Sequence, residues 1–322
     1  MITRAIQATT LYFGPRIHVL SWPWPWVVII LLSAVEAAWL LTTPLQLDVS
    51  SVPSLIALGS IAAAAILLSA RLQGVPRLTI LLRGLTFLFV AWPALRLFNH
   101  LTMTLPFPLA DAWLYRWDQA IGFDWFAYLM WVDAKPFLVQ AMAQAYTALS
   151  GYSCLLFIIL ALGHYPERRC AEMIELFVLT ALACMTLGMF FPAEAAMAYL
   201  APPPETFAHF NSLTGTYHLS SLGELRANPS HALDIRFLPG LVTFPSFHTA
   251  MGVVAIYCAR GSVWLFPPML VVNLLMISST PVFGSHYAVD VIAGVCITVF
   301  VILMHRHVSR SGPSALCMWL RR

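Results

Sequence analysis

Two short segments of the sequence combine histidine with residue types that suit phosphoryl transfer. They are residues 244–249 (FPSFHT) and 284–290 (GSHYAVD). In the second segment, His286 and Asp290 are four residues apart, a spacing that places two side chains on one face of a helix. A carboxylate that accepts the imidazole Nδ1 proton fixes the tautomer and leaves Nε2 with a lone pair that can attack phosphorus. This segment therefore predicts a nucleophilic histidine oriented by a carboxylate.

The first segment is typical of a helix start that binds an anion. Pro245 is favourable there because its missing N–H would have no acceptor in the first turn, and Ser246 falls at the expected N-cap. The backbone N–H groups that follow, beginning at Phe247, can hold phosphate oxygens, and the hydroxyls of Ser246 and Thr249 are further donors. His248 is placed to protonate a leaving oxygen. The two segments together predict a reaction that requires no metal and no other cofactor.

Each histidine taken alone has a simpler interpretation, that of a structural hydrogen-bonding group near the end of a membrane helix. The combination of proline, serine, histidine and aspartate at these spacings favours a catalytic pair instead. Two predicted membrane spans separate the segments, and a two-span hairpin returns the chain to the same membrane face. We therefore expect both segments to meet in one site.

Membrane helices are the elements that must position this site. Apolar residues make up 60% of the 322 residues and charged residues only 10%, whereas a soluble domain carries about a quarter charged residues. A spanning helix needs about 20 mainly apolar residues. Stretches that reach or approach this length lie near 25–43, 52–70, 78–98, 137–163, 171–191, 247–261, 263–281 and 287–305. The sequence predicts an all-α fold, a polytopic membrane helical bundle of about eight transmembrane helices. The small net charge of +3 and the absence of a basic run argue against a nucleic-acid partner.

Two long gaps separate groups of predicted spans. Residues 99–136 interleave tryptophan and tyrosine with aspartate and arginine, which suits a helix lying in the membrane interface, although an ordinary loop is equally compatible. Residues 192–246 are polar, rich in proline and glycine, and lead into the first histidine segment. We assign residues 1–136 to N-terminal membrane helices plus the interfacial segment and residues 137–322 to the catalytic membrane domain, the two forming one integrated domain.

The distribution of basic residues predicts the orientation, because cytoplasmic loops carry an excess of Lys and Arg. With eight spans and a cytoplasmic N-terminus, most of them fall on the cytoplasmic side: Arg4, Arg16, Arg71, Arg77, Arg168, Arg169, Arg260, Arg306, Arg310, Arg321 and Arg322. The outer side holds Arg96, Arg116, Lys135, Arg226 and Arg236. We expect an integral membrane protein of a bacterial inner membrane, with its active site on the periplasmic or other extracytoplasmic face.

The histidine segments resemble two signatures of the type 2 phosphatidic acid phosphatase (PAP2) superfamily, and the resemblance covers about residues 180–305. The family pattern is Pro-Ser-Gly-His, followed by Ser-Arg, five residues, His, three residues and Asp. The matching positions are Pro245, Ser246, His248, Ser279, His286 and Asp290. The resemblance implies a PAP2-type catalytic core in which His286 is the nucleophile, Asp290 orients it and His248 is the acid and base.

Three positions depart from the family pattern. Phe247 replaces the usual glycine, Thr280 stands where the family has a phosphate-binding arginine, and residues 191–196 (FPAEAA) lack the basic residues of an upstream signature. These departures are similar to the inositol phosphorylceramide synthase branch, whose members move a phosphorylated headgroup from one lipid to another acceptor. Residues 111–125 and the Pro-Ala pair at 192–193 resemble that branch more weakly.

Another cation must then neutralise the phosphate. We expect Arg236 to do so, because it precedes Pro245 by nine residues on the same face. Arg226, Arg116 and Arg96 are alternatives, and a solvated loop residue is the simpler interpretation of Arg236.

Three functions are compatible with the sequence. The first is a phosphatase acting on phosphatidate, an isoprenyl phosphate or a similar lipid through a phosphohistidine intermediate that water resolves. The second is a lipid headgroup phosphotransferase, in which an alcohol resolves the intermediate. The third is a transporter or non-catalytic membrane protein, since histidine and aspartate also form proton relays. The partners expected are a lipid phosphate substrate and the membrane lipids, and the sequence does not indicate an oligomeric state.

Overall fold

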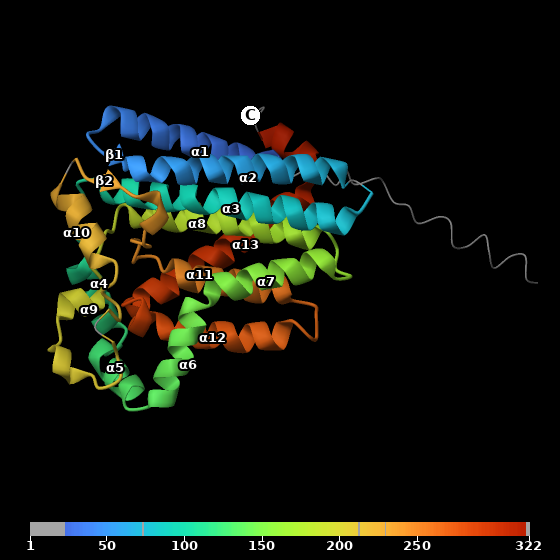
Figure 1. Ribbon diagram of the computed structural model, residues 1–322. Helices are drawn as coiled ribbons and strands as arrows, with labels where there is room; N and C mark the ends of the chain where they lie inside the picture. Colours follow the sequence, from blue (N-terminus) through green and yellow to red (C-terminus); the bar gives the residue numbers. More distant parts are fainter. Residues whose placement is uncertain (1–22, 73, 212, 229, 320–322) are drawn as a thin grey trace, which may run out of the picture.

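Helices form most of the chain in the computed structural model, which describes residues 23–319 except 73, 212 and 229 (Figure 1). The first half contains α1 (Pro23–Thr42), β1 (Gln46–Leu47), η1 (Val49–Ser51), α2 (Val52–Arg71), α3 (Pro76–Met103), α4 (Asp111–Ala120), α5 (Trp125–Asp133), α6 (Pro136–Thr147) and α7 (Leu149–Leu162). The second half contains α8 (Arg168–Gly188), α9 (Ala196–Leu200), η2 (Pro204–Thr206), α10 (Leu219–Ala227), β2 (Ala232–Leu233), η3 (Ile235–Phe237), α11 (Phe247–Ala259), α12 (Phe266–Phe283) and α13 (Ala288–Trp319). The strands β1 and β2 pair in parallel.

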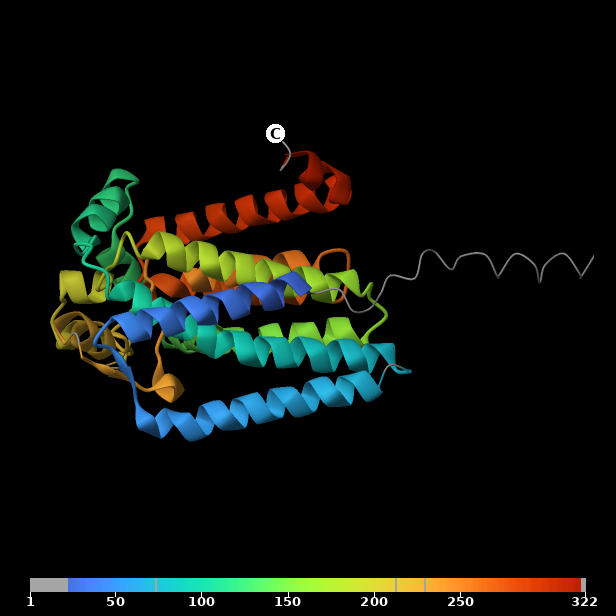
Figure 2. The same ribbon diagram turned by 90° about the horizontal axis from the view of Figure 1, so that it is seen from above.

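The long helices confirm the predicted all-α membrane bundle. Within the described residues, six helices, α1, α2, α3, α8, α12 and α13, are long and apolar enough to cross a membrane. The bent pair α6 and α7 adds a seventh span if the two helices are counted as one. The sixth predicted span, near residues 247–261, corresponds to α11, which is apolar but has only 13 residues. In Figures 1 and 2 the long helices run side by side along a common direction.

The span predicted over residues 137–163 is broken rather than straight. Helices α6 and α7 meet at Ala148 with a bend of 57°. The two halves have different packing partners, because α6 lies against α12 whereas α7 lies against α3 and α8. Figure 1 shows α6 directed toward the end of the bundle that carries the short helices.

The short elements form a layer over one end of the bundle. Helices α4, α5, α9 and α10 and the two strands gather there (Figure 1). Residues 99–136 thus contain two helices, and Asp124 caps the second of them by accepting the Ala127 N–H at 2.9 Å. The loops before α11 and α13 open at this same end, as the two-span argument predicts.

The basic residues predicted to be cytoplasmic lie at the opposite end where they are described. Those in the described loops and helix ends there are Arg71, Arg77, Arg168, Arg169, Arg260 and Arg306. Arg4, Arg16, Arg321 and Arg322 lie outside the described residues. The site end and the arginine-rich end are therefore separated by the length of the bundle.

Candidate active site

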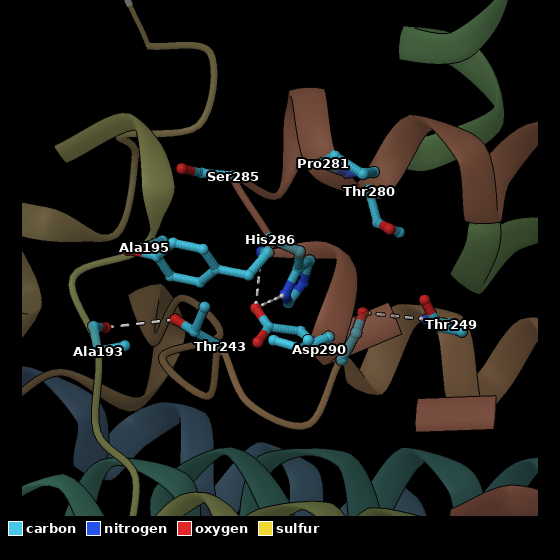
Figure 3. Close-up of polar contacts among 12 residues, drawn as sticks. Ala193, Ala195, Thr243, Thr249, Thr280, Pro281, Ser285, His286 and Asp290 are labelled. Carbon is cyan, nitrogen blue, oxygen red and sulfur yellow. Dashed lines mark hydrogen bonds and ion pairs between the residues drawn. The ribbon is translucent and has the colours of Figure 1, made fainter. Parts of the chain in front are cut away.

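His286 and Asp290 contact each other at the start of α13 (Figure 3). The imidazole Nδ1 lies 3.2 Å from Asp290 Oδ2, and the same oxygen accepts the Tyr287 backbone N–H at 2.9 Å. Both side chains are buried, with 4% and 0% exposure. Helix α13 begins at Ala288, so His286 precedes the helix instead of lying within it. The four-residue spacing still brings the two groups together, because the chain enters the helix without a gap.

The loop that carries His286 is fixed by backbone hydrogen bonds on both sides. Ser285 has a φ of 56°, in the left-handed region, which turns the chain between α12 and α13. Its carbonyl accepts the Ala196 N–H at 2.9 Å and its hydroxyl accepts the Met197 N–H. The His286 N–H donates to the Thr280 carbonyl at 3.2 Å. The loop that carries the imidazole is thus held by the start of α9, and the imidazole itself contacts Asp290.

The second segment joins this site through the N-terminus of α11. Ser246 caps the helix by accepting the Thr249 N–H at 3.3 Å, and the Ser246 N–H donates to the Asp290 carbonyl at 3.0 Å. A Cβ on Gly294 would lie 2.5 Å from the Ser246 carbonyl oxygen, so the glycine permits this close approach of α13 to α11. The Phe247 and His248 N–H groups have no acceptor within the described part of the chain, as expected for a helix start that can hold an anion.

His248 is positioned by a tyrosine on α6. The two rings stack with centroids 4.2 Å apart and planes 10° from parallel. The Tyr146 hydroxyl lies 3.4 Å from that of Tyr217, which precedes α10. A Cβ on Gly284 would lie 2.8 Å from the Tyr146 hydroxyl and 3.0 Å from His286 Nε2. The glycine therefore leaves open the space between that hydroxyl and the ring nitrogen that is not paired with Asp290.

These side chains line one end of a large cavity, of about 1030 Å³, inside the bundle. The polar end is formed by Arg96, Tyr146, Tyr217, His218, His248 and His286. The other end is apolar and lies among α2, α3, α7 and α8, with lining residues that include Leu58, Ala62, Leu85, Phe89, Phe157 and Phe177. The arrangement can hold a polar headgroup beside the histidines and an apolar chain among the helices.

The positions where the family motifs have cations hold none. The Thr280 hydroxyl donates to the Ile277 carbonyl of its own helix at 2.8 Å, and its carbonyl accepts the N–H groups of Gly284 and His286. Residues 193–195 lie beside the His286 loop, and the Thr243 hydroxyl donates to the Ala193 carbonyl there at 3.3 Å (Figure 3). A cation that binds phosphate in this cavity would have to come from elsewhere in the chain.

The predicted cation Arg236 lines the cavity but is already paired. Its Nη2 lies 2.6 Å from Asp234 Oδ2 and 2.8 Å from the Ser50 hydroxyl. This guanidinium holds the pKa of the Asp234 carboxyl well below its usual range. Among the alternatives, Arg226 donates to the Met103 and Phe107 carbonyls and Arg116 is exposed. Arg96 lies in the cavity.

Two aspartates of α4 hold the site together, and our sequence reasoning did not identify them as site residues. Asp118 accepts the Ala288 and Val289 N–H groups at 2.9 Å each, so it caps α13 from another helix. Asp111 accepts the Glu194 and Ala195 N–H groups at 3.0 Å and the Tyr287 hydroxyl at 2.9 Å. The available signal was their seven-residue spacing, which puts both on one face of a short helix.

Removing the Asp118 carboxylate is expected to weaken the fold at the site. Asp118→Ala deprives two partly buried N–H groups of their acceptor, which lowers the free energy of unfolding by about 1–3 kcal/mol. Thermal unfolding in detergent measures the loss. Asp124→Ala, which removes an exposed cap of α5, is the matched control and is expected to cost less. Equal losses in the two variants would contradict a clamping role for Asp118.

Burial sets the protonation of the site histidines that lie outside the helices. It lowers the pKa of His286 to about 4, and the Thr243 carbonyl partly offsets this effect. Burial also lowers the pKa of His218, which the Glu194 carbonyl partly offsets at 3.2 Å from Nε2. Both imidazoles are therefore neutral at pH 7, the form in which a histidine can attack an electrophile.

A family model described as the PAP2 superfamily matches residues 112–304. The match runs from α4 into α13 and includes both histidine segments. No curated protein and no solved structure matches the chain.

Proposed function

Since the chain belongs to the PAP2 superfamily, we propose that it cleaves the phosphate ester of a membrane lipid through a phosphohistidine at His286. Membership of this superfamily suggests a phosphatase or phosphotransferase. The observation that carries the proposal is the His286–Asp290 pair, whose imidazole lines the polar end of a cavity with an apolar interior. A lipid phosphate has this same division between headgroup and chain.

The reaction has two steps. The His286 imidazole, with Asp290 on Nδ1, attacks phosphorus through Nε2 as the bond to the lipid oxygen breaks. His248 gives its proton to that oxygen, so the alcohol leaves neutral. His248 then takes a proton from water, and the hydroxide formed attacks phosphorus of the phosphohistidine. The bond between phosphorus and His286 Nε2 breaks, its electron pair returns to Nε2, and phosphate leaves. Donors at the start of α11 bind the oxygens on which charge accumulates.

A lipid headgroup phosphotransferase is the second candidate, and the scarcity of cations favours it. The full positive charges that line the cavity come from Arg96 and Arg236, and Asp234 neutralises the latter. A phosphomonoester carries about −1.5 to −2 charges at pH 7, whereas a phosphodiester carries one. In this reaction an alcohol replaces water in the second step.

The orientation is part of the proposal. Over the full sequence, five basic residues are assigned to the side of the site, whereas eleven are assigned to the opposite side. By the distribution of basic residues the site faces the periplasm or another extracytoplasmic space of a bacterial inner membrane. A cysteine introduced at exposed Leu213 is expected to react with an impermeant maleimide in intact cells, and protection until lysis would contradict the orientation.

The activity is tested with purified protein in detergent and a panel of phosphatidate, isoprenyl phosphates and phospholipids. Release of inorganic phosphate from a monoester would support the phosphatase. Headgroup exchange, seen only when diacylglycerol, ceramide or inositol is added, would support the phosphotransferase. Neither reaction on any lipid, with protein that is folded and monodisperse, would contradict the proposal.

The cavity predicts a dependence on chain length. Ala62 of α2 lines the apolar end, and Ala62→Trp fills part of the space that an acyl or isoprenyl chain would occupy. KM for long-chain substrates is expected to rise about tenfold, because part of the apolar contact is lost, while short-chain analogues are unaffected. Ala63→Trp, on the exposed side of the same helix, is the matched control. Equal effects of Ala62→Trp on short and long chains would contradict chain binding in the cavity.

Turnover is expected to persist into acid. The pKa of His286 is lowered from 6.5 to about 4, so the neutral nucleophile is retained as pH falls through 6.5 and is lost only near 4. The unfolded chain binds a proton at this histidine over that window, so stability falls as pH drops from 6.5 toward 4. A kcat profile from pH 4 to 8 measures the effect. An acid limb centred near 6.5 would contradict a buried neutral His286.

A further inference from the structure

The cation that the family motifs lack is supplied from a helix outside the family match. We propose that Arg96 of α3 binds the phosphate group of the substrate. This inference rests on the proposed function of the cavity, and α3 ends at Met103, before the matched residues 112–304 begin.

Arg96 is the cation of the polar end whose charge is not balanced. Within the described residues no carboxylate lies within ion-pair distance of its guanidinium. Its contacts are the Leu238 carbonyl, to which Nη1 donates, and the Trp92 ring, 4.6 Å from Cζ. A half-buried guanidinium without an anion is a costly arrangement, and a bound phosphate would satisfy it.

The position of Arg96 suits an anion attacked by His286. Arg96 lines the cavity together with His248, His286, Tyr146 and Tyr217. The two tyrosine hydroxyls add donors on the same side. A planar guanidinium can hold two oxygens of one phosphate in a fixed orientation, which a point charge cannot.

Neighbouring residues of α3 fix the base of this arginine. The Asn99 Oδ1 accepts the Leu241 N–H at 2.8 Å, and His100 Nδ1 lies 3.0 Å from the Arg96 carbonyl. The Leu238 carbonyl and the Leu241 N–H belong to the irregular segment that leads into α11. These contacts thus fix the position of Arg96 relative to the start of α11, where the phosphate is proposed to bind.

Arg236 is the competing cation, and it differs from Arg96 in its surroundings. Its guanidinium makes three contacts of 2.6–3.1 Å with the Asp234 carboxylate. Binding a phosphate there would require that this pair separate, because the carboxylate repels a second anion. Removing the charge of Arg96 is therefore expected to weaken anion binding, whereas removing the charge of Arg236 is not.

The test measures binding of tungstate, a tetrahedral oxyanion that the enzyme cannot turn over, by thermal shift of the full-length protein in detergent. Tungstate is expected to raise the melting temperature of the wild type. Arg96→Gln is expected to weaken binding roughly 10- to 100-fold, the range for a lost charge-assisted hydrogen bond. The tungstate affinity of Arg96→Lys is expected to lie between those of the wild type and Arg96→Gln. If Arg96→Gln does not fold, the affinity of Arg96→Lys tests the role of Arg96. Arg83→Gln, which removes a charge from the same helix at a residue bound to Ser69, is the matched control.

Three results would overturn the assignment: no tungstate binding by the wild type, wild-type affinity in Arg96→Gln, or loss of binding in Arg236→Gln instead. His286→Ala separates this inference from the proposed function, because it is expected to bind tungstate while lacking turnover. If the Arg96 variants lose tungstate binding and no lipid is turned over by the wild type, the anion site stands and the proposed function fails.

Discussion

His286→Ala is expected to lower turnover of lipid phosphates by roughly 10,000-fold or more, as for removal of other covalent nucleophiles. The variant lacks the nitrogen that forms the bond to phosphorus, and among the described residues no other imidazole that lines the cavity pairs with a carboxylate. His248 stacks on Tyr146 and His218 contacts a carbonyl, so neither is oriented for attack. Release of phosphate or exchange of headgroup, measured against the wild type at equal protein, gives the ratio.

His209→Ala is the matched control for this loss. His209 also lies beside a buried aspartate, with Nδ1 3.8 Å from Asp133 Oδ1, but it is absent from the cavity lining. The control is expected to keep turnover within about twofold of the wild type, the effect expected of a substitution away from the site. Retention of more than a tenth of the activity by His286→Ala would show that another group attacks phosphorus.

Asp290→Asn is expected to lower turnover by roughly 100- to 10,000-fold, the range seen when the orienting carboxylate of a triad is neutralised. The amide oxygen can still accept the Tyr287 N–H, so the start of α13 is kept. The negative charge that stabilises the imidazole as its Nε2 gives up electrons to phosphorus is lost. The amide also places an N–H₂ where Asp290 Oδ1 has no partner within the described residues.

The control for Asp290→Asn is Asp133→Asn. Asp133 is likewise a buried carboxylate that accepts backbone N–H groups, from Ala208 and His209 at 2.8 Å, outside the cavity. Both variants are expected to unfold at similar temperatures, and only Asp290→Asn is expected to lose turnover. If Asp290→Asn lowered the melting temperature as well as turnover, the loss of turnover would be explained by a structural role of Asp290 as a helix cap.

Much of the fold could be predicted from the sequence because membrane helices must be long and apolar. The broken span at Ala148 could not, since no proline lies at the break and the nearest glycine, Gly151, lies inside α7; the different neighbours of α6 and α7 accompany the bend. The short span over α11, by contrast, could be predicted, because the apolar stretch near residues 247–261 is itself short. Its start is set by the Ser246 cap, which the sequence indicates, and its end at Ala259 is followed by Gly261 at a φ of 72°.

Contacts between residues close in the sequence could be predicted at the site, whereas contacts between residues far apart in the sequence could not. The contact between His286 and Asp290 depends on four residues of chain, and the Ser246 cap depends on three. Asp111 and Asp118 act through backbone groups more than 80 residues away, which no local pattern records. The cation that would bind phosphate could not be identified from the sequence for the same reason. Several arginines of the outer side were equivalent candidates until the structure showed their contacts.

The covalent phosphohistidine at His286 is tested most directly by trapping the labelled intermediate without exposure to acid. Wild-type protein is mixed with a lipid carrying ³²P in its phosphate, denatured in alkali within the first turnover, digested and mapped by mass spectrometry. We expect label on the peptide that carries His286, stable in alkali and released by acid, and no label in His286→Ala. Label on a peptide that lacks His286, or turnover without any trapped label under conditions where hydrolysis of the intermediate is slow, would contradict it.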